Sequence, residues 1–188
     1  MAADLPRLRS FPPVADPATA HTLILGSMPG VASLAAGRYY AHPRNQFWPI
    51  MGALFGAGPV LPYEARLQAL IRAGIALWDV LESCERPGSL DADIDLRSAQ
   101  ANDFVEFFAA HPGVCRVAFN GGTAERLFRR DIAPQLRPLE LIRLPSTSPA
   151  YAGLPAERKL AAWQAALCGQ GPAPAGDKED TRTGAKRR

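Results

Sequence analysis

The sequence has few of the features that mark metal sites, disulfide frameworks and membrane spans. Its 188 residues include only three cysteines, Cys84, Cys115 and Cys168, and no two of them form a C-x-x-C pair. This spacing disfavours a zinc site or a disulfide framework, and three thiols are too few for the usual all-cysteine ligation of an iron–sulfur cluster. No apolar run is long enough to cross a bilayer, and the first residues lack the apolar core of a secretory signal. We therefore expect an intracellular, cytoplasmic protein that uses no metal, iron–sulfur cluster or other cofactor.

An excess of one charge is also absent from the part expected to fold. The formal net charge is +3, from 21 Lys and Arg against 18 Asp and Glu. The segment 169–188 contributes +2 of this, because it has five basic and three acidic residues. It is rich in Pro, Gly and charge and has little to bury, which predicts a disordered charged tail. The rest of the chain is nearly neutral, so net charge says little about partners. Residues 1–20 are Pro-rich and are expected to form an extended N-terminal arm.

Between these ends, short apolar runs alternate with amphipathic stretches of helical spacing. Strands are expected over 21–26, 75–81, 114–120 and 139–144, and helices over 45–55, 63–73, 102–110, 123–130 and 156–167. Strands separated by helices pair in parallel through crossovers, and near-continuous apolar strands belong in a sheet covered on both faces. The sequence therefore predicts an α/β fold over 21–168. We expect a single domain, a three-layer α/β/α sandwich around a four-stranded parallel sheet.

Small, hydroxyl-bearing, Gly and Pro residues follow the expected strands. They form GSMPG at 26–30, the end of the second strand at Asp79, NGGT at 120–123 and LPSTSPAYAG at 144–153. In such sheets ligands bind outside the carboxyl ends of the strands. Glycines let the backbone approach a ligand closely, and free N–H groups bind phosphate oxygens. This edge of the sheet is therefore expected to bind a phosphorylated ligand.

The order of these segments, together with YAHPRNQFW at 40–48, resembles the uracil-DNA glycosylase superfamily and looks closest to its hypoxanthine-DNA (deoxyinosine) glycosylase branch. Mismatch-specific uracil-DNA glycosylases share a similar A-H-P-x-N-x-F-W segment. The resemblance covers roughly residues 20–168 and implies a uracil-DNA glycosylase-like fold. It also implies a monofunctional enzyme that flips a deaminated base and hydrolyses its N-glycosidic bond, leaving an abasic site without metal or cofactor. The expected partner is DNA containing deaminated bases, met at the nucleoid, and the protein is expected to be a monomer.

The resemblance assigns the catalytic step to Asn45. Many relatives carry Asp or Asn at the position of Met28 to place the attacking water, and the Met28 side chain cannot do so. Asn45 is the nearest polar candidate, and it takes over this role by resemblance to the hypoxanthine branch. An amide orients a water but is a poor base, which suits a reaction led by departure of the base. The alternative role for Asn45 is to cap the helix that starts there, and one residue can do both.

The residues expected to bind the base are Gly26, Met28, Pro29, Tyr40 and Asp79. Tyr40 stands where relatives place an aromatic residue that stacks on the base, and its alternative is a core tyrosine. Asp79 stands where uracil-specific relatives place Asn. A carboxylate there would accept from the N1–H of hypoxanthine and oppose the N1 lone pair of adenine. It could equally accept from uracil N3–H, and an Asp that binds backbone amides in a turn is the other interpretation.

Leu144 is a second departure from the family pattern. Relatives often carry His or Asn at this position, where the fourth-strand motif begins. Without that polar group, the pocket lacks a donor to the negative charge that develops on the departing base. This argues against strong uracil activity, and backbone amides near Met28 and Pro29 would then carry more of the stabilisation.

Two glycine- and hydroxyl-rich segments are expected to contact DNA. Three consecutive hydroxyl residues between prolines at a strand end fit a phosphate site, although any one of them could simply form a turn. The Gly-Gly pair fits a backbone grip on DNA or plain turn chemistry, and Tyr151 or Leu154 could wedge into the duplex. The DNA-binding residues are thus predicted to be Gly121, Gly122, Ser146, Thr147, Ser148 and Tyr151.

Three other functions stay open. A serine hydrolase is suggested by Ser27, but a nucleophile elbow has the pattern G-x-S-x-G, and here Ser follows Gly directly. None of the three histidines, His21, His42 and His111, is an obvious partner for it. A non-catalytic nucleotide- or lesion-DNA-binding domain is the second, although the chain lacks G-x-G-x-x-G and a Walker-type lysine. The third is a mismatch-type uracil-DNA glycosylase.

Overall fold

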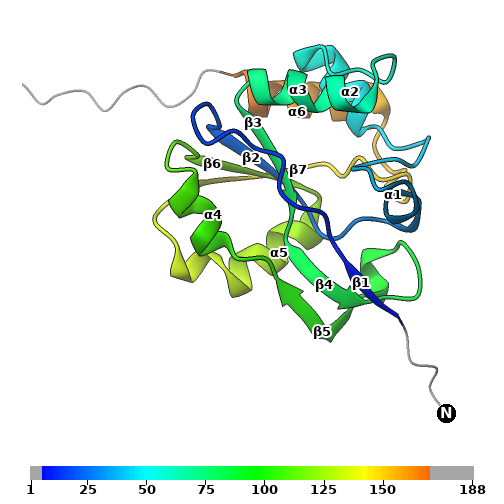
Figure 1. Cartoon of the computed structure of the whole chain (residues 1–188). Helices are drawn as coiled ribbons and strands as arrows, with labels where there is room; N and C mark the ends of the chain where they lie inside the picture. The colour runs from blue at the N-terminus through cyan, green and yellow to red at the C-terminus, as the bar shows by residue number, and fades with distance from the viewer. Residues whose placement is uncertain (1–5, 170–188) are drawn as a thin grey trace, which may run out of the picture.

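The computed structural model describes residues 6–169, so of the tail expected over 169–188 all but Gly169 lies outside the described residues. The central sheet is parallel, and its four strands lie in the order β3-β2-β6-β7 (Figure 1). This confirms the expected α/β class and the four-stranded parallel sheet. In chain order the strands are β2 Thr22–Gly26, β3 Ile75–Asp79, β6 Arg116–Asn120 and β7 Glu140–Leu144.

Helices cover both faces of this sheet, which makes the molecule a three-layer sandwich (Figure 1). Residues of β2 alternate between two apolar clusters, each shared with a different group of helices. Ile24 belongs to one cluster, and Leu23 and Leu25 belong to the other. Every residue of β2 and β3 is buried for this reason. The helices that share the cluster of Ile24 are α2 (Phe47–Phe55), α3 (Tyr63–Arg72) and α6 (Ala156–Cys168). Those that share the cluster of Leu23 and Leu25 are α4 (Phe104–Ala110) and α5 (Gly122–Asp131).

A second, antiparallel sheet of three strands, in the order β1-β4-β5, is not predicted from the sequence. The strand expected over 75–81 is in fact two strands, because β3 ends at Asp79 and Leu81 already begins β4 in the other sheet. The last strand, DLRSAQA, has no fully buried residue, so it lacks the apolar alternation that marks a strand. The strands are β1 Arg7–Arg9, β4 Leu81–Glu85 and β5 Asp95–Ala101, and the six-residue α1 (Val31–Ala36) is also unpredicted.

The N-terminal segment, residues 6–15, runs in extended form across both sheets. Its β1 pairs with β4, and further on Val14 pairs with Leu77 of the parallel sheet. The Phe11 carbonyl accepts a hydrogen bond of 3.0 Å from Trp78 Nε1 and lies 3.4 Å from the hydroxyl of Tyr39. This segment therefore supplies acceptors to buried aromatic side chains. Among residues 6–169, no helix combines the length and apolar character needed to cross a membrane.

Candidate active site

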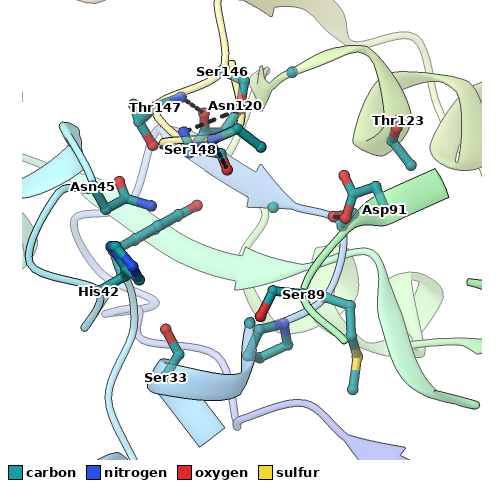
Figure 2. A pocket seen from close by; sticks show the side chains of 18 of the residues that line it. Ser33, His42, Asn45, Ser89, Asp91, Asn120, Thr123, Ser146, Thr147 and Ser148 are labelled. Atoms are coloured by element: carbon teal, nitrogen blue, oxygen red, sulfur yellow. Dashed lines mark hydrogen bonds between the residues drawn. The ribbon is translucent and has the colours of Figure 1, made fainter. Parts of the chain in front are cut away.

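A cavity of about 540 Å³ opens at the carboxyl edge of the parallel sheet (Figure 2). Strand register explains its position, because Gly26 pairs with Asp79 and Asn120 with Leu144, so all four strands end at one level. The cavity brings together every residue that the sequence analysis assigns to the site. These are Gly26, Met28, Pro29, Tyr40, Asn45, Asp79, Gly121, Gly122, Ser146, Thr147, Ser148 and Tyr151.

Two unpaired polar groups meet at the floor of the cavity. Asp79 is 3% exposed, and within the described chain neither its Oδ2 nor the buried hydroxyl of Tyr40 has a hydrogen-bond partner. Gly26 makes room for both. A Cβ at this glycine would collide with Asp79 Oδ1 and would lie 3.2 Å from the Tyr40 hydroxyl. Unpaired buried polar atoms are costly, so this pair is suited to a ligand that supplies the missing hydrogen bonds.

The surroundings of the Asp79 carboxyl raise its pKa toward neutral pH. Burial, helped by the nearby Asp91 carboxylate and opposed by the Arg86 guanidinium, raises the pKa of Asp79 to about 7. Desolvation disfavours the charged form of a carboxyl group, which is why burial acts in this direction. Asp79 therefore acts as an acceptor above neutral pH and can donate a proton below it.

The Tyr40 ring is held in a fixed plane beside this carboxyl. It stacks on Phe47 with ring centroids 3.9 Å apart and an interplanar angle of 21°. The backbone of Tyr40 has a φ of 54°, in the left-handed region that non-glycine residues rarely adopt. Such a conformation persists only where the surroundings enforce it. Burial, together with the Asp79 charge, raises the pKa of the Tyr40 hydroxyl, so this group stays neutral.

Asn45 lies at the start of α2 with its side chain toward the cavity (Figure 2). Its Oδ1 accepts from the Phe47 N–H at 2.9 Å, a bond across the turn that precedes the helix. The N-cap residue is Gln46 and has no side-chain cap, so Asn45 is not the cap that the sequence suggests as its alternative role. Next to it, the Gln46 N–H donates to the Thr147 carbonyl at 3.0 Å, so the turn is tied to the loop after β7. The amide keeps a second lone pair on Oδ1 and two donors on Nδ2. Asn45 thus supports the turn before the helix and still has polar atoms to offer in the cavity.

Asn120 is a cavity residue that sequence reasoning missed. Its Nδ2 donates to Thr147 Oγ1 and its Oδ1 accepts from the Thr147 N–H, both at 2.8 Å (Figure 2). Thr147 is fully buried, so its hydroxyl serves this pair, whereas Ser146 and Ser148 are only half-buried. Gly121 has a φ of 105°, and a Cβ there would lie 3.1 Å from the Cβ of Ser146. The position of Asn120 as the last residue of a strand was the available signal.

The loop between β4 and β5 forms a wall that the sequence does not predict. Asp91 accepts a 2.6 Å hydrogen bond from the Ser27 hydroxyl, and Ser89 Oγ accepts one of 2.9 Å from the Val31 N–H. These bonds join the loop to the segment after β2. They also occupy the Ser27 hydroxyl with a carboxylate, whereas the hydrolase alternative needs a histidine at that atom. Burial raises the pKa of Asp91, and the bond from Ser27 opposes this.

The described residues include no group of three or more His, Cys, Asp or Glu side chains arranged to hold a metal ion. The cavity instead combines a buried carboxyl, a phenol ring, an amide and several hydroxyls with exposed turns of backbone. This set can hold a planar polar ring, orient a water and receive phosphate oxygens.

Fold and site together define an α/β domain with a preformed polar pocket at the ends of its parallel strands. The family model of the uracil DNA glycosylase superfamily matches residues 12–167. The chain therefore belongs to the uracil DNA glycosylase superfamily. It is a DNA glycosylase, a hydrolase of N-glycosyl bonds.

Similar proteins agree with this assignment. A hypoxanthine DNA glycosylase of Methanosarcina barkeri (strain Fusaro / DSM 804) is 40% identical over 114 residues, which cover 60% of this chain and 70% of the relative. A hypoxanthine DNA glycosylase of Methanosarcina acetivorans is 37% identical over 117 residues, 62% of this chain and 72% of the relative. A solution NMR structure from Methanosarcina acetivorans, provisionally described as a uracil DNA glycosylase, matches with a TM-score of 0.68 and 32% identity. That match covers 86% of this chain and 96% of the other.

Proposed function

We propose that the protein excises hypoxanthine from deoxyinosine in DNA, leaving an abasic site without cutting the strand. The observation that carries this proposal is the buried, unpaired Asp79 carboxyl at the pocket floor. The two relatives named hypoxanthine DNA glycosylases support the same substrate. We propose a monomer that acts on DNA in the cytoplasm.

Asp79 selects the base because its Oδ2, which has no hydrogen-bond partner within the described chain, needs a donor from the base. Hypoxanthine presents an N1–H donor, which the Asp79 carboxylate accepts. Adenine presents a lone pair at N1, so its binding to the ionised form of Asp79 would leave two acceptors facing each other. A buried group deprived of its partner costs about 1–3 kcal/mol, and more when it is charged. This mismatch is the source of discrimination against the normal purine.

The Tyr40 ring receives the flipped base. Extrusion from the duplex costs a few kcal/mol, and stacking on an aromatic ring returns about 1–3 kcal/mol. Phe47 supports Tyr40 from the other side, with 3.9 Å between ring centroids. The platform is therefore rigid before the base arrives, and little ordering is needed on binding.

Asn45 orients the attacking water. As the N-glycosidic bond lengthens, positive charge develops on the sugar and negative charge on the base. A water held by the Asn45 amide then adds to C1′, and its proton passes to solvent or to the released base. The bond from Oδ1 to the Phe47 N–H fixes the side chain, so the water meets a preformed partner.

The departing base takes its stabilisation from backbone amides. Leu144 is 3% exposed and packs in the core cluster with Phe47, so it offers no side-chain donor at this position. Met28 and Pro29 line the cavity, and we expect the N–H groups of Met28 and Gly30 to act as the donors, since Pro29 has none. Preformed backbone donors aimed at developing charge are effective in sites that exclude water.

Two loops grip the DNA backbone. The helix α5 begins at Gly122 beside the cavity, and a helix N-terminus with free N–H groups attracts phosphate. Ser146, Thr147 and Ser148 line the cavity directly beside this turn, since a Cβ at Gly121 would lie 3.1 Å from the Cβ of Ser146, and the two serines are half-buried. Tyr151, 47% exposed at the rim, is the wedge that fills the space left by the flipped base.

Uracil is the second candidate base. The Asp79 carboxylate can accept from uracil N3–H as it does from hypoxanthine N1–H, and the superfamily itself is named for uracil. Loss of the polar group at Leu144 favours hypoxanthine over uracil. A binding domain without catalysis is the remaining alternative, and it would hold lesion DNA without releasing a base.

An abasic-site assay decides among these. Oligonucleotides carrying hypoxanthine, xanthine or uracil are incubated with excess enzyme, and strand breaks are scored before and after alkali. We expect hypoxanthine to be released fastest and breaks to arise only after alkali. Asn45→Ala should abolish release, whereas Gln164→Ala, which removes an exposed carboxamide on α6, should not. Faster release of uracil would assign the protein to the mismatch-type class.

A further inference from the structure

Arg86 is a buried cation to which the steps above give no role. It follows β4 and is 2% exposed, with a side chain fully shielded from solvent. Its Nη2 donates to the Pro29 carbonyl at 2.5 Å, and within the described chain Nε and Nη1 have no hydrogen-bond partner. A buried guanidinium with unpaired N–H groups destabilises a fold. Local rules are broken in this way mostly where function requires it.

The hydrogen bond from Arg86 reaches the pocket through a single peptide unit. The Pro29 carbonyl and the Gly30 N–H belong to the same planar trans peptide, in which C=O and N–H point in opposite directions. Gly30 lines the cavity and Arg86 does not. The carbonyl is turned toward Arg86, so the Gly30 N–H is turned away from Arg86. Donation to the carbonyl also polarises the peptide and strengthens its N–H as a donor.

The positive charge of Arg86 is only loosely compensated. Its nearest carboxylate is Asp91, with Nη1 and Oδ1 3.8 Å apart, and that oxygen is closer to the Ser27 hydroxyl at 2.6 Å. The Asp91 side chain is 37% exposed, so solvent shares its charge. The field of Arg86 extends to the floor of the pocket, where it opposes the rise in the pKa of Asp79.

We propose that Arg86 is a positioning residue that stabilises the departing base anion, through the polarised Pro29–Gly30 peptide and through its buried positive charge. This inference rests on the proposed function. In the reaction the electron pair of the N-glycosidic bond moves to the base, and the water oxygen bonds to C1′. Arg86 thus stabilises the base anion from outside the pocket lining, whereas the aliphatic side chain of Leu144 has no donor with which to do so.

Two substitutions separate this role from a purely structural one. Arg86→Lys keeps the charge, while Arg86→Gln keeps a donor for the Pro29 carbonyl and removes the charge. We expect Arg86→Lys to excise hypoxanthine within a few-fold of wild type in single-turnover assays. Arg86→Gln should lose about 10- to 100-fold, below the range for deleting a direct donor because the charge acts at a distance. Both should bind duplex carrying 2′-fluoro-2′-deoxyinosine, which resists hydrolysis, with wild-type affinity.

If Arg86 had only a structural role, Arg86→Gln should be at least as active as Arg86→Lys, because Arg86→Gln removes an unfavourable buried charge. Equal or higher activity of Arg86→Gln relative to Arg86→Lys overturns the proposal. Should Arg86→Gln fail to fold by thermal melting, Asp91→Asn is the second test. It leaves Arg86 in place without its counter-charge and should raise the single-turnover rate at pH 8, and a fall would overturn the proposal. If the wild-type protein excises no base, the proposed function itself is wrong. If the wild type is active but Arg86→Gln is at least as active as Arg86→Lys, only the proposed role of Arg86 is wrong.

Discussion

Asn45 and Asp79 share one pocket but sit in different surroundings, and these surroundings divide the proposed chemistry between them. Asp79 is sealed at the floor, where burial moves its pKa to about 7. Asn45 is half-buried at the start of a helix and cannot change its charge. A titrating group that reads the base and a neutral group that orients water are the roles that these environments favour.

Substitution of Asn45 separates catalysis from support of the turn before α2. Both Asn45→Ala and Asn45→Ser should lower the single-turnover rate of hypoxanthine excision by about 100-fold or more, because a positioned catalytic group contributes that much. Only Asn45→Ala should also lose about 1 kcal/mol of stability, because Ser can still accept from the Phe47 N–H. Rates and urea unfolding are measured together. If Asn45→Ser had wild-type activity as well as wild-type stability, the role of Asn45 would be limited to its hydrogen bond with the Phe47 N–H.

The rate of excision should depend on pH through Asp79. Its pKa is about 7 in the folded protein, above the ordinary value of 3.8, so the carboxyl is protonated below neutral pH and ionised above it. Because the carboxylate form accepts from N1–H, the single-turnover rate for hypoxanthine should rise as pH increases through about 7. A rate that falls over this range would mean that Asp79 works as an acid.

Asp79→Asn is the control for this profile. A carboxyl whose pKa is raised on folding lowers the free energy of unfolding as pH rises from about 4 to about 7, by up to a few kcal/mol in all. The amide has no such titration. Asp79→Asn should therefore flatten the pH–rate profile, and it should be more stable than wild type at pH 8 in urea unfolding.

At the scale of elements, the pocket depends on contacts between loops that come from different strands. The pair Asn120–Thr147 joins the ends of β6 and β7, and the bond from Gln46 to the Thr147 carbonyl adds the start of α2. Thr147 is thus a shared support for the turn that carries Asn45.

Asn120→Ala should loosen this support. It leaves the buried N–H and hydroxyl of Thr147 without partners, which should lower the free energy of unfolding by about 1–3 kcal/mol. Excision should slow as well, since Asn120 no longer fixes Thr147, whose carbonyl accepts from the Gln46 N–H. Thr147→Val is the matched control, because it removes the hydroxyl but keeps the N–H bond to Asn120. Additive losses in the double variant, measured by urea unfolding, would contradict a coupled pair.

The elements that sequence analysis predicts are those whose signal is local. The strands β2, β3, β6 and β7 are short, mostly apolar segments. Parallel pairing gathers their carboxyl ends, so residues such as Asp79 could be assigned to one edge. The strand β5 is unpredicted because none of its residues is buried. Asp91 is unpredicted because its bond to Ser27 spans 64 residues of sequence. No local pattern signals such a contact, nor does one signal the buried Arg86.

At the scale of the whole molecule, the N-terminal segment fastens the two sheets to each other. It adds a strand to one sheet, pairs with Leu77 in the other and accepts from Trp78 Nε1. Tyr39, whose hydroxyl donates to the Pro12 carbonyl at 3.1 Å, precedes Tyr40 in the pocket. The segment therefore supports the pocket although it contributes no residue to its lining.

Removal of residues 1–15 should lower the melting temperature by on the order of 10 °C, because several kcal/mol of pairing and buried hydrogen bonds are lost. Excision should fall with it, as Tyr39 and Tyr40 shift. Arg9→Ala is the control, because it breaks only an exposed ion pair with Glu82 and should cost less than about 1 kcal/mol. An unchanged melting temperature for the truncated protein, by differential scanning calorimetry, would show that the segment is dispensable.

The most direct measurement is mass spectrometry of the products formed from a duplex with a single deoxyinosine. The account predicts free hypoxanthine and an unbroken strand with one abasic site, and no base released from a duplex with adenine in that position. Stable binding of the deoxyinosine duplex with no base released would contradict it.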